Sequence, residues 1–249
     1  MVKLNDLIDY TQQYMQVDRY KDYCPNGLQV EGRAEVRKIV TGVSASLDFL
    51  QQAADSGADL VLVHHGYFWR NEDPRVVGMK RKRLAFLMAQ DISLMAYHLP
   101  LDVHPELGNN VLLGRKLGLV QVGTAGESGL VCYGRLEQAA SLAEFTKGLD
   151  AMMQRPSLVI GDLNKPLKTV AWCTGAGQAY IEEAIRLGVD AFISGEISEQ
   201  TTHLAKESGV AFIAAGHHAT ERYGVQALGE HLANKFAIQH DFLDLYNPV

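Results

Sequence analysis

The chain has 249 residues, of which 47% are hydrophobic and 21% charged, so it is long enough for one large or two modest domains with a substantial core. Its formal net charge of −6 argues against a nucleic-acid partner, because proteins that bind phosphate backbones normally carry a basic surface. No segment has the apolar length of a signal peptide or a membrane span, so we expect a cytoplasmic protein with no membrane partner.

Short apolar runs rich in valine and isoleucine alternate with segments of helical period, which is typical of βαβ units on a mainly parallel sheet. For the first half of the chain we expect strands at residues 37–43, 59–63 and 92–97 and helices at residues 47–56, 80–90 and 109–117. The basic run of residues 80–83 is more typical of a solvated helix start than of a surface that attracts anionic substrates.

The second half of the chain repeats this pattern after a less regular stretch. We expect strands at residues 169–173, 190–194 and 210–215 and helices at residues 179–187, 199–207 and 220–235. The glycine-rich stretch 123–166 is predicted to be a connector with small α/β content, including a helix that begins at the capping box Ser141-x-x-Glu144. The expected domains are therefore an α/β lobe at 1–122, this connector, and a second α/β lobe at 167–249.

The two lobes have the pattern of a diverged internal repeat. The motif His98-x-x-x-Asp102 after one strand is matched by His217-x-x-x-Glu221 after another. Ligands of open α/β sheets bind beyond the carboxyl ends of the strands. We therefore predict an α/β fold of two similar lobes with mainly parallel sheets that face a shared metal site.

A divalent metal site is indicated by histidines and carboxylates at these strand ends. His64 and His65 follow an apolar run, and Gly66 is expected to supply the turn that lets both imidazoles point into one cavity. The chain has three cysteines and no Cys-x-x-Cys pair, so the ligands must be nitrogen and oxygen atoms. The candidate metal ligands are His64, His65, Asp102, His217 and Glu221.

Each candidate also has an ordinary structural interpretation. Histidines at strand ends often hydrogen-bond backbone groups, and an aspartate beside Pro100 is typical of a turn or a helix cap. A glutamate at a helix start, such as Glu221, complements the helix dipole. The match between the two His-x-x-x-acid motifs favours metal binding over these alternatives.

Five ligands are too many for one catalytic tetrahedral zinc and suit two divalent ions per chain. A mixed nitrogen and oxygen shell suits Zn, Mn, Fe or Ni, and Mg stays open, so the identity of the metal is not predicted. His98 and Glu196 are the candidate catalytic residues, because their side chains could move protons. The alternative for both is an ordinary loop residue or a residue that orients a ligand.

At these residues the sequence closely resembles the NIF-three-like family, also called the GTP cyclohydrolase I type 2 homologues, and especially its bacterial YbgI-type members. The matching motifs are Pro25-Asn26-Gly27-Leu28-Gln29-Val30, Val63-His64-His65-Gly66, His98-Leu99-Pro100-Leu101-Asp102, His104-Pro105-Glu106-Leu107-Gly108-Asn109-Asn110, Ser194-Gly195-Glu196 and Gly216-His217-His218-Ala219-Thr220-Glu221-Arg222. The resemblance implies a two-lobed α/β fold, a toroidal homohexamer and a dinuclear metal centre with the same five ligands.

Two functions follow as hypotheses from the predicted centre. The first is a dinuclear metal-dependent hydrolase that acts on a nucleotide-like or small phosphorylated or heterocyclic substrate, including GTP cyclohydrolase-type ring opening. The alternative is a non-enzymatic, ring-shaped metal-binding adaptor or metal-handling protein, in which the ions stabilise the fold.

Overall fold

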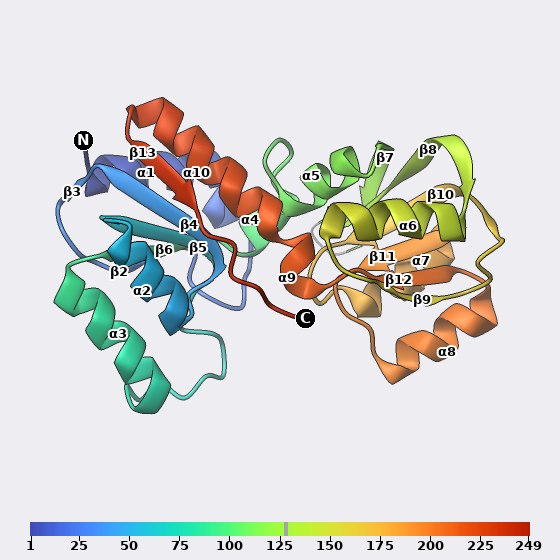
Figure 1. Ribbon diagram of the computed structural model, residues 1–249, viewed down its shortest axis with the longest axis horizontal. Coiled ribbons are helices and arrows are strands. Elements are labelled where there is room, and N and C mark those ends of the chain that lie inside the picture. The colour runs from blue at the N-terminus through green and yellow to red at the C-terminus, as the bar shows by residue number, and fades with distance from the viewer. Residues whose placement is uncertain (127–128) are drawn as a thin grey trace. The chain divides into compact units, whose positions relative to one another are not determined.

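The computed structural model describes residues 1–126 and 129–249, which form two compact units (Figure 1). The first unit comprises Met1–His104 and Gly224–Tyr246, and the second comprises Pro105–Tyr223 and Asn247–Val249. None of the helices in these described ranges is both long and apolar enough to cross a membrane.

The first unit contains a five-stranded sheet in the order β13-β4-β5-β6-β2. Its parallel strands are β13 (Gln239–Phe242), β4 (Lys38–Ser44), β5 (Leu60–His65) and β6 (Ser93–Ala96). The strand β2 (Gly27–Val30) is antiparallel to β6 at one edge. A separate two-stranded sheet pairs β1 (Val2–Lys3) with β3 (Glu35–Val36).

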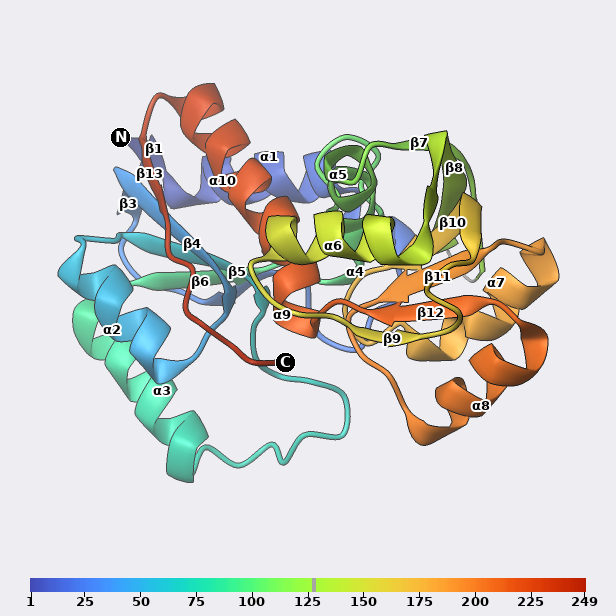
Figure 2. The ribbon, with the colours of Figure 1, turned by 45° about the vertical axis from the view of Figure 1, so that its right-hand side comes forward.

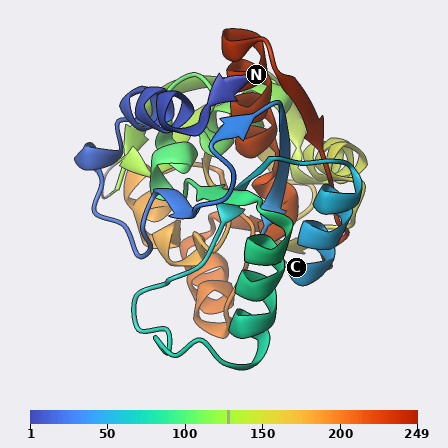
Figure 3. The ribbon, with the colours of Figure 1, turned by 90° about the vertical axis from the view of Figure 1, so that its left-hand side faces the viewer.

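Helices cover both faces of this sheet, as Figures 2 and 3 show. One face packs against α2 (Leu47–Asp55) and α3 (Gly78–Gln90), and the other faces α1 (Leu4–Met15) and α10 (Arg222–Phe236). Because both faces are buried, β5 is a continuous apolar run until it reaches its histidines. The short helix α4 (Leu99–Val103) follows β6.

The second unit contains a six-stranded sheet in the order β7-β8-β10-β11-β12-β9. Its central strands β10 (Pro166–Cys173), β11 (Ala191–Ser194) and β12 (Ala211–Ala214) are parallel. Antiparallel strands flank them, namely β7 (Leu119–Ala125) and β8 (Val131–Ser141) on one side and β9 (Leu158–Ile160) on the other.

Two layers of helices enclose this second sheet (Figure 2). Alternate residues of β10 pack on opposite faces: Trp172 contributes to the core beneath α5 (Asn109–Lys116) and α6 (Leu142–Met153). Ala171 contributes to the core beneath α7 (Ile181–Leu187) and α8 (Glu199–Ser208). The predicted capping box is present, because Ser141 and Glu144 exchange hydrogen bonds at the start of α6.

Both units fix the start of a central strand with an aspartate. In the first unit, Asp59 Oδ2 accepts hydrogen bonds from the backbone N–H groups of Arg37 and Lys38, at 2.7 and 3.2 Å. In the second, Asp190 Oδ2 accepts from those of Lys168 and Thr169, both at 2.9 Å. Asp59 and Asp190 therefore perform the same local task in the two units.

The observed units differ from the expected domains at two places. The stretch 123–166, expected to be a connector, supplies β8, α6 and β9, so it is part of the second unit's sheet and core. The segment from Gly224 to Tyr246, expected in the second lobe, belongs to the first unit, because β13 pairs in parallel with β4. A strand with the polar sequence Gln-His-Asp-Phe carries little signal of this long-range pairing.

Candidate metal centre

His64 is held by the backbone at the end of β5. Its side chain is fully buried, and its Nδ1 atom lies 2.8 Å from the carbonyl oxygen of Tyr97. A carbonyl oxygen only accepts hydrogen bonds, so Nδ1 donates and a neutral imidazole carries its lone pair on Nε2. This arrangement is the usual one for a metal-binding histidine, whose other nitrogen is anchored by a carbonyl or a carboxylate.

Asp102 faces that Nε2 atom from α4. The Asp102 carboxylate is buried, and its Oδ1 atom lies 3.4 Å from His64 Nε2. With a neutral imidazole and Nδ1 as the donor, these two atoms are both acceptors, and either a proton on Nε2 or a metal ion bound to both atoms makes the contact favourable. A divalent ion that takes nitrogen and oxygen ligands fits this donor pair.

His65 is the last residue of β5, so the strand runs further than the sequence predicts. Its Nδ1 atom lies 3.0 Å from Ser44 Oγ, and the centroids of the His64 and His65 rings are 4.6 Å apart. Gly66 does not have the positive φ of a tight turn. It is required by packing, because a Cβ there would lie 2.6 Å from the Cβ of Ala96.

His98 forms a dyad with Asp22, a residue that nothing in the sequence pattern identifies. The His98 Nδ1 atom lies 2.7 Å from Asp22 Oδ1, and Asp22 Oδ2 accepts from the N–H of Leu99 and the amide of Asn26. Burial of Asp22 opposes ionisation, but the hydrogen bond and charge of His98 outweigh it and lower the pKa of Asp22 to about 2. The dyad therefore fixes the ring of His98.

The first unit thus gathers three imidazoles in one place. Ligand nitrogens of His64, His65 and His98 all lie within 4.8 Å of one another, so these three side chains could hold a metal ion together. Asp22, Cys24 and His98 form a second group of this kind. Burial and the charge of Asp22 raise the pKa of the Cys24 thiol to about 12, so Cys24 is protonated at neutral pH and is a poor ligand.

In the second unit, His217 lies between two carboxylates. His217 begins α9 (His217–Thr220), which follows β12, and its Nε2 atom lies 3.1 Å from Oε2 of the buried Glu221. Its Nδ1 atom lies 2.6 Å from Glu196 Oε1. Burial disfavours the charged imidazole, but Glu221 first and then Glu196 favour it, and the pKa of His217 rises to about 9.

This geometry also suits a metal. Without one, the protonated imidazole of His217 pairs with Glu221, and an ion bound there would replace the proton on Nε2. Glu196, predicted as a catalytic residue, lies where it orients the ligand His217 through Nδ1.

Gly175, in the turn after β10, lets the backbone lie close to the side chains of His217 and Glu221. It has a φ of +64°, and a Cβ there would overlap Glu221 Oε1 and lie 3.1 Å from His217 Nε2. Its N–H donates to Thr220 Oγ1 at 3.0 Å. Three of the five predicted ligands therefore lie in the first unit and two in the second, and each set has its own anchoring contacts.

The chain is similar to known proteins over nearly its whole length. The family model of Duf34/NIF3 (NGG1p interacting factor 3) matches residues 2–248. A curated relative from Pseudomonas aeruginosa, named GTP cyclohydrolase 1 type 2 homolog, is 53% identical over 252 residues, covering 100% of this chain and 99% of the relative.

Solved structures share the fold over the whole chain. A protein described as ybgI, of unknown function, superposes with a TM-score of 0.97 at 48% identity, covering 100% of both chains. A protein from Thermus thermophilus superposes with a TM-score of 0.91 at 34% identity, again over 100% of both chains. The match of the family model over nearly every residue, together with these relatives, shows that the chain belongs to the Duf34/NIF3 family.

Proposed function

We propose that the chain is a metal-dependent hydrolase whose dinuclear centre is held by His64, His65, Asp102, His217 and Glu221. The observation that carries the proposal is that acceptor atoms of His64 and Asp102 face each other at 3.4 Å while the far nitrogen of His64 is anchored. His217 and Glu221 repeat this arrangement at 3.1 Å, with Glu196 as the anchor. Two divalent ions at such a site would polarise a substrate and lower the pKa of a bound water toward neutrality.

The residues of the chain have separate tasks in this proposal. Tyr97 and Glu196 orient the two anchored histidines through their Nδ1 atoms. His98, fixed by Asp22, exchanges a proton with the substrate or with water through Nε2. The hydrogen bond between Asp22 Oδ1 and His98 Nδ1 leaves Nε2 as the nitrogen of His98 that faces away from Asp22.

The proposed substrate is a nucleotide-like or small phosphorylated or heterocyclic molecule. The name of the Pseudomonas relative supports GTP cyclohydrolase-type chemistry as one case, in which hydrolysis opens a purine ring. We also propose, from the family resemblance, that the chain assembles with itself into a toroidal homohexamer. Light scattering of the purified protein measures that assembly directly.

The proposed function is tested by loading the chelated protein with Zn, Mn, Fe, Ni or Mg and assaying GTP, other nucleotides and small phosphoesters. Native protein is compared with His64→Ala and Glu221→Gln, and with control variants His203→Ala and Glu207→Gln at exposed positions of α8. We expect turnover that disappears on chelation and in both ligand variants while the controls remain active.

Turnover that persists in metal-free protein would refute the hydrolase proposal. Bound metal without turnover, combined with unfolding or dissociation on chelation, would support a structural role in a metal-binding adaptor instead. Thermal melting with and without chelator provides that comparison.

A further inference from the structure

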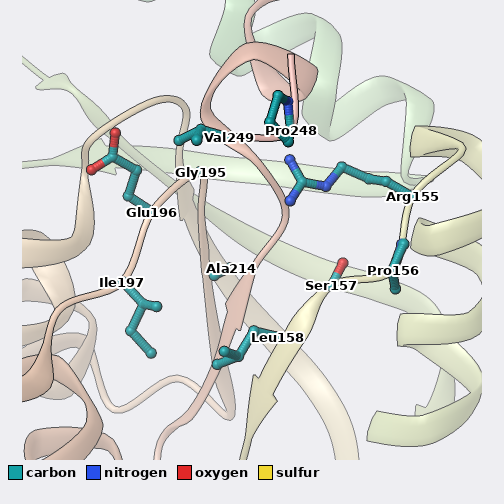
Figure 4. A pocket seen from close by; sticks show the side chains of 10 residues that line it. All are labelled: Arg155, Pro156, Ser157, Leu158, Gly195, Glu196, Ile197, Ala214, Pro248 and Val249. Atoms are coloured by element: carbon teal, nitrogen blue, oxygen red, sulfur yellow. The ribbon is translucent and has the colours of Figure 1, made fainter. Parts of the chain in front are cut away.

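The second unit contains a cavity of about 640 Å³ at the carboxyl ends of β11 and β12 (Figure 4). Its volume is in the range of small-molecule sites, and this edge of parallel strands is where α/β sheets bind ligands. Figure 4 shows Arg155 and Ser157 on one side and Glu196 and Ile197 on the other. Glu196 also accepts the hydrogen bond of His217, so the cavity lies beside that ligand.

Two polar atoms of the cavity lining have no hydrogen-bond partner within the described part of the chain. These atoms are Arg155 Nη1 and Ser157 Oγ, and both are buried. A buried donor without a hydrogen-bond partner destabilises the protein, and more so when the donor is charged. A guanidinium and a hydroxyl on one wall are donors that a phosphate or carboxylate group would satisfy.

Asp150 fixes the segment that carries both donors without neutralising the guanidinium. Its backbone carbonyl accepts from Arg155 N–H at 3.2 Å, and its Oδ1 atom accepts from Ser157 N–H at 2.9 Å. Among the residues that the structure describes, Arg155 forms no ion pair with a carboxylate. The Oε1 atom of Glu196, which also lines the cavity, is paired with His217 and not with Arg155.

The guanidinium of Arg155 also packs against the backbone that precedes His217. Gly216 has a φ of +104°, and a Cβ there would overlap Arg155 Nη1 and lie 2.6 Å from Arg155 Cζ. The cavity therefore adjoins His217 through Gly216 as well as through Glu196. A molecule bound by Arg155 would lie next to the second unit's candidate metal ligands.

We propose that this cavity binds the oxyanion of a small organic molecule, with Arg155 and Ser157 as donors to a phosphate or carboxylate group. The apolar side chains of Leu158 and Ile197 also line the cavity and would pack against the body of the ligand. The further statement that this ligand is the substrate rests on the proposed function. In that case Arg155 and Ser157 bind the anionic group of the substrate, and hydrolysis takes place at the proposed metal centre.

The test is calorimetric titration of phenyl phosphate, benzoate and uncharged phenol into native protein, Arg155→Gln, Ser157→Ala and the control Arg135→Gln. Arg135 is an exposed arginine of β8 outside the cavity. We expect at least one of the two anions to bind metal-free native protein and Arg135→Gln equally, and at least about tenfold more weakly to Arg155→Gln. The tighter of the two anions identifies the group, and Ser157→Ala should weaken it by a smaller factor.

The proposal is overturned if neither anion binds more tightly than phenol, or if Arg155→Gln binds both like native protein. Ser157→Ala keeps the test decisive if Arg155→Gln does not fold.

The same titrations on metal-loaded protein distinguish failure of the oxyanion site from failure of the proposed hydrolase function. Anion binding that needs metal and Glu221 but not Arg155 would overturn the oxyanion site and leave the metal centre standing. Arg155-dependent binding by a chain that takes up no metal would refute only the proposed function.

Discussion

The Nε2 atom of His64 and the Oδ1 atom of Asp102 lie 3.4 Å apart in a buried environment while Nδ1 of His64 donates to Tyr97. When the imidazole is neutral, neither atom donates, and the contact becomes favourable when a proton or a metal ion lies between the two atoms. This contact predicts that Asp102→Asn weakens metal binding but does not destabilise the metal-free protein.

Asp102→Asn should weaken metal binding by about tenfold or more, because it removes an anionic ligand. In chelated protein the same variant should be as stable as the native chain, or more stable by about 1 kcal/mol, since the new amide can donate to His64 Nε2. Metal titration and chemical denaturation of both forms measure these effects, with Glu207→Gln as the exposed control. Equal loss of stability in the presence and absence of metal would show that Asp102 is only a structural residue.

The raised pKa of His217 predicts that metal binding releases a proton. His217 has a pKa of about 9 against an ordinary value of 6.5, so at about pH 7.5 the metal-free imidazole is protonated and must lose its proton to bind an ion. Metal affinity should therefore rise with pH up to about 9. Calorimetry at neutral pH in buffers of different ionisation enthalpy counts the released protons, and Glu196→Gln should reduce the count.

The raised pKa of His217 also makes the stability of the metal-free protein depend on pH. A group whose folded pKa is raised stabilises the protein fully below its unfolded value of 6.5, and that contribution is lost as the pH rises through about 9. Chelated native protein should become less stable relative to His217→Gln between these pH values. Chemical denaturation at several pH values measures the free energy of unfolding of both chains. If the two values change with pH by the same amount, the ion pairs of His217 with Glu221 and Glu196 are not present.

Asp22→Asn should lower turnover, because His98 is no longer held in position, without changing metal binding. The variant keeps the shape of the side chain but removes the charge beside His98, so we expect turnover to fall by about tenfold or more with metal content unchanged. The pH profile of the remaining activity should move, which a purely structural role would not cause. The exposed Asp18→Asn provides the matched control.

Asp22 should also contribute to acid stability. Its folded pKa of about 2 lies below its ordinary value of 3.8, so its contribution of about 2 kcal/mol is present above pH 3.8 and lost as the pH falls through 2. Native protein should lose stability relative to Asp22→Asn over that interval. Acid denaturation of both chains, followed by circular dichroism, measures the difference.

Gly175→Ala and Gly188→Ala form a matched pair. Both glycines have nearly the same positive φ, +64° and +65°, but only at Gly175 would a Cβ meet other atoms, including Glu221. Both variants should lose about 1 kcal/mol or more from backbone strain. Only Gly175→Ala should also weaken metal binding, which metal titration of the two variants would measure.

The sequence predicts the regular elements of this fold because their signals are local. Short apolar runs between segments of helical period locate β4, β5, β10 and β11 to within a few residues, and the capping box locates the start of α6. The helix α1 and the polar strand β13 are not predicted, because their burial comes from distant partners. The mixed α/β class follows from the pattern, whereas the assignment of Gly224–Tyr246 to the first unit does not.

The candidate site shows the same limit. The five residues that the motif spacing predicts as ligands lie at the end of β5, in α4, and at the two ends of α9. Asp22 is separated from His98 by 76 residues, and only the folded chain brings them together. Arg155 likewise carries no motif, and only the folded chain shows that it lines a cavity with a buried Nη1 atom that has no hydrogen-bond partner in the described residues.

The most direct test of the central claim is elemental analysis of the purified and reconstituted chain, with His64→Ala, Glu221→Gln and the control His203→Ala beside it. The proposal predicts about two divalent ions per native chain and per control chain, and a clear loss in both ligand variants. A native chain that takes up no metal on reconstitution, or ligand variants that keep the full metal content, would contradict it.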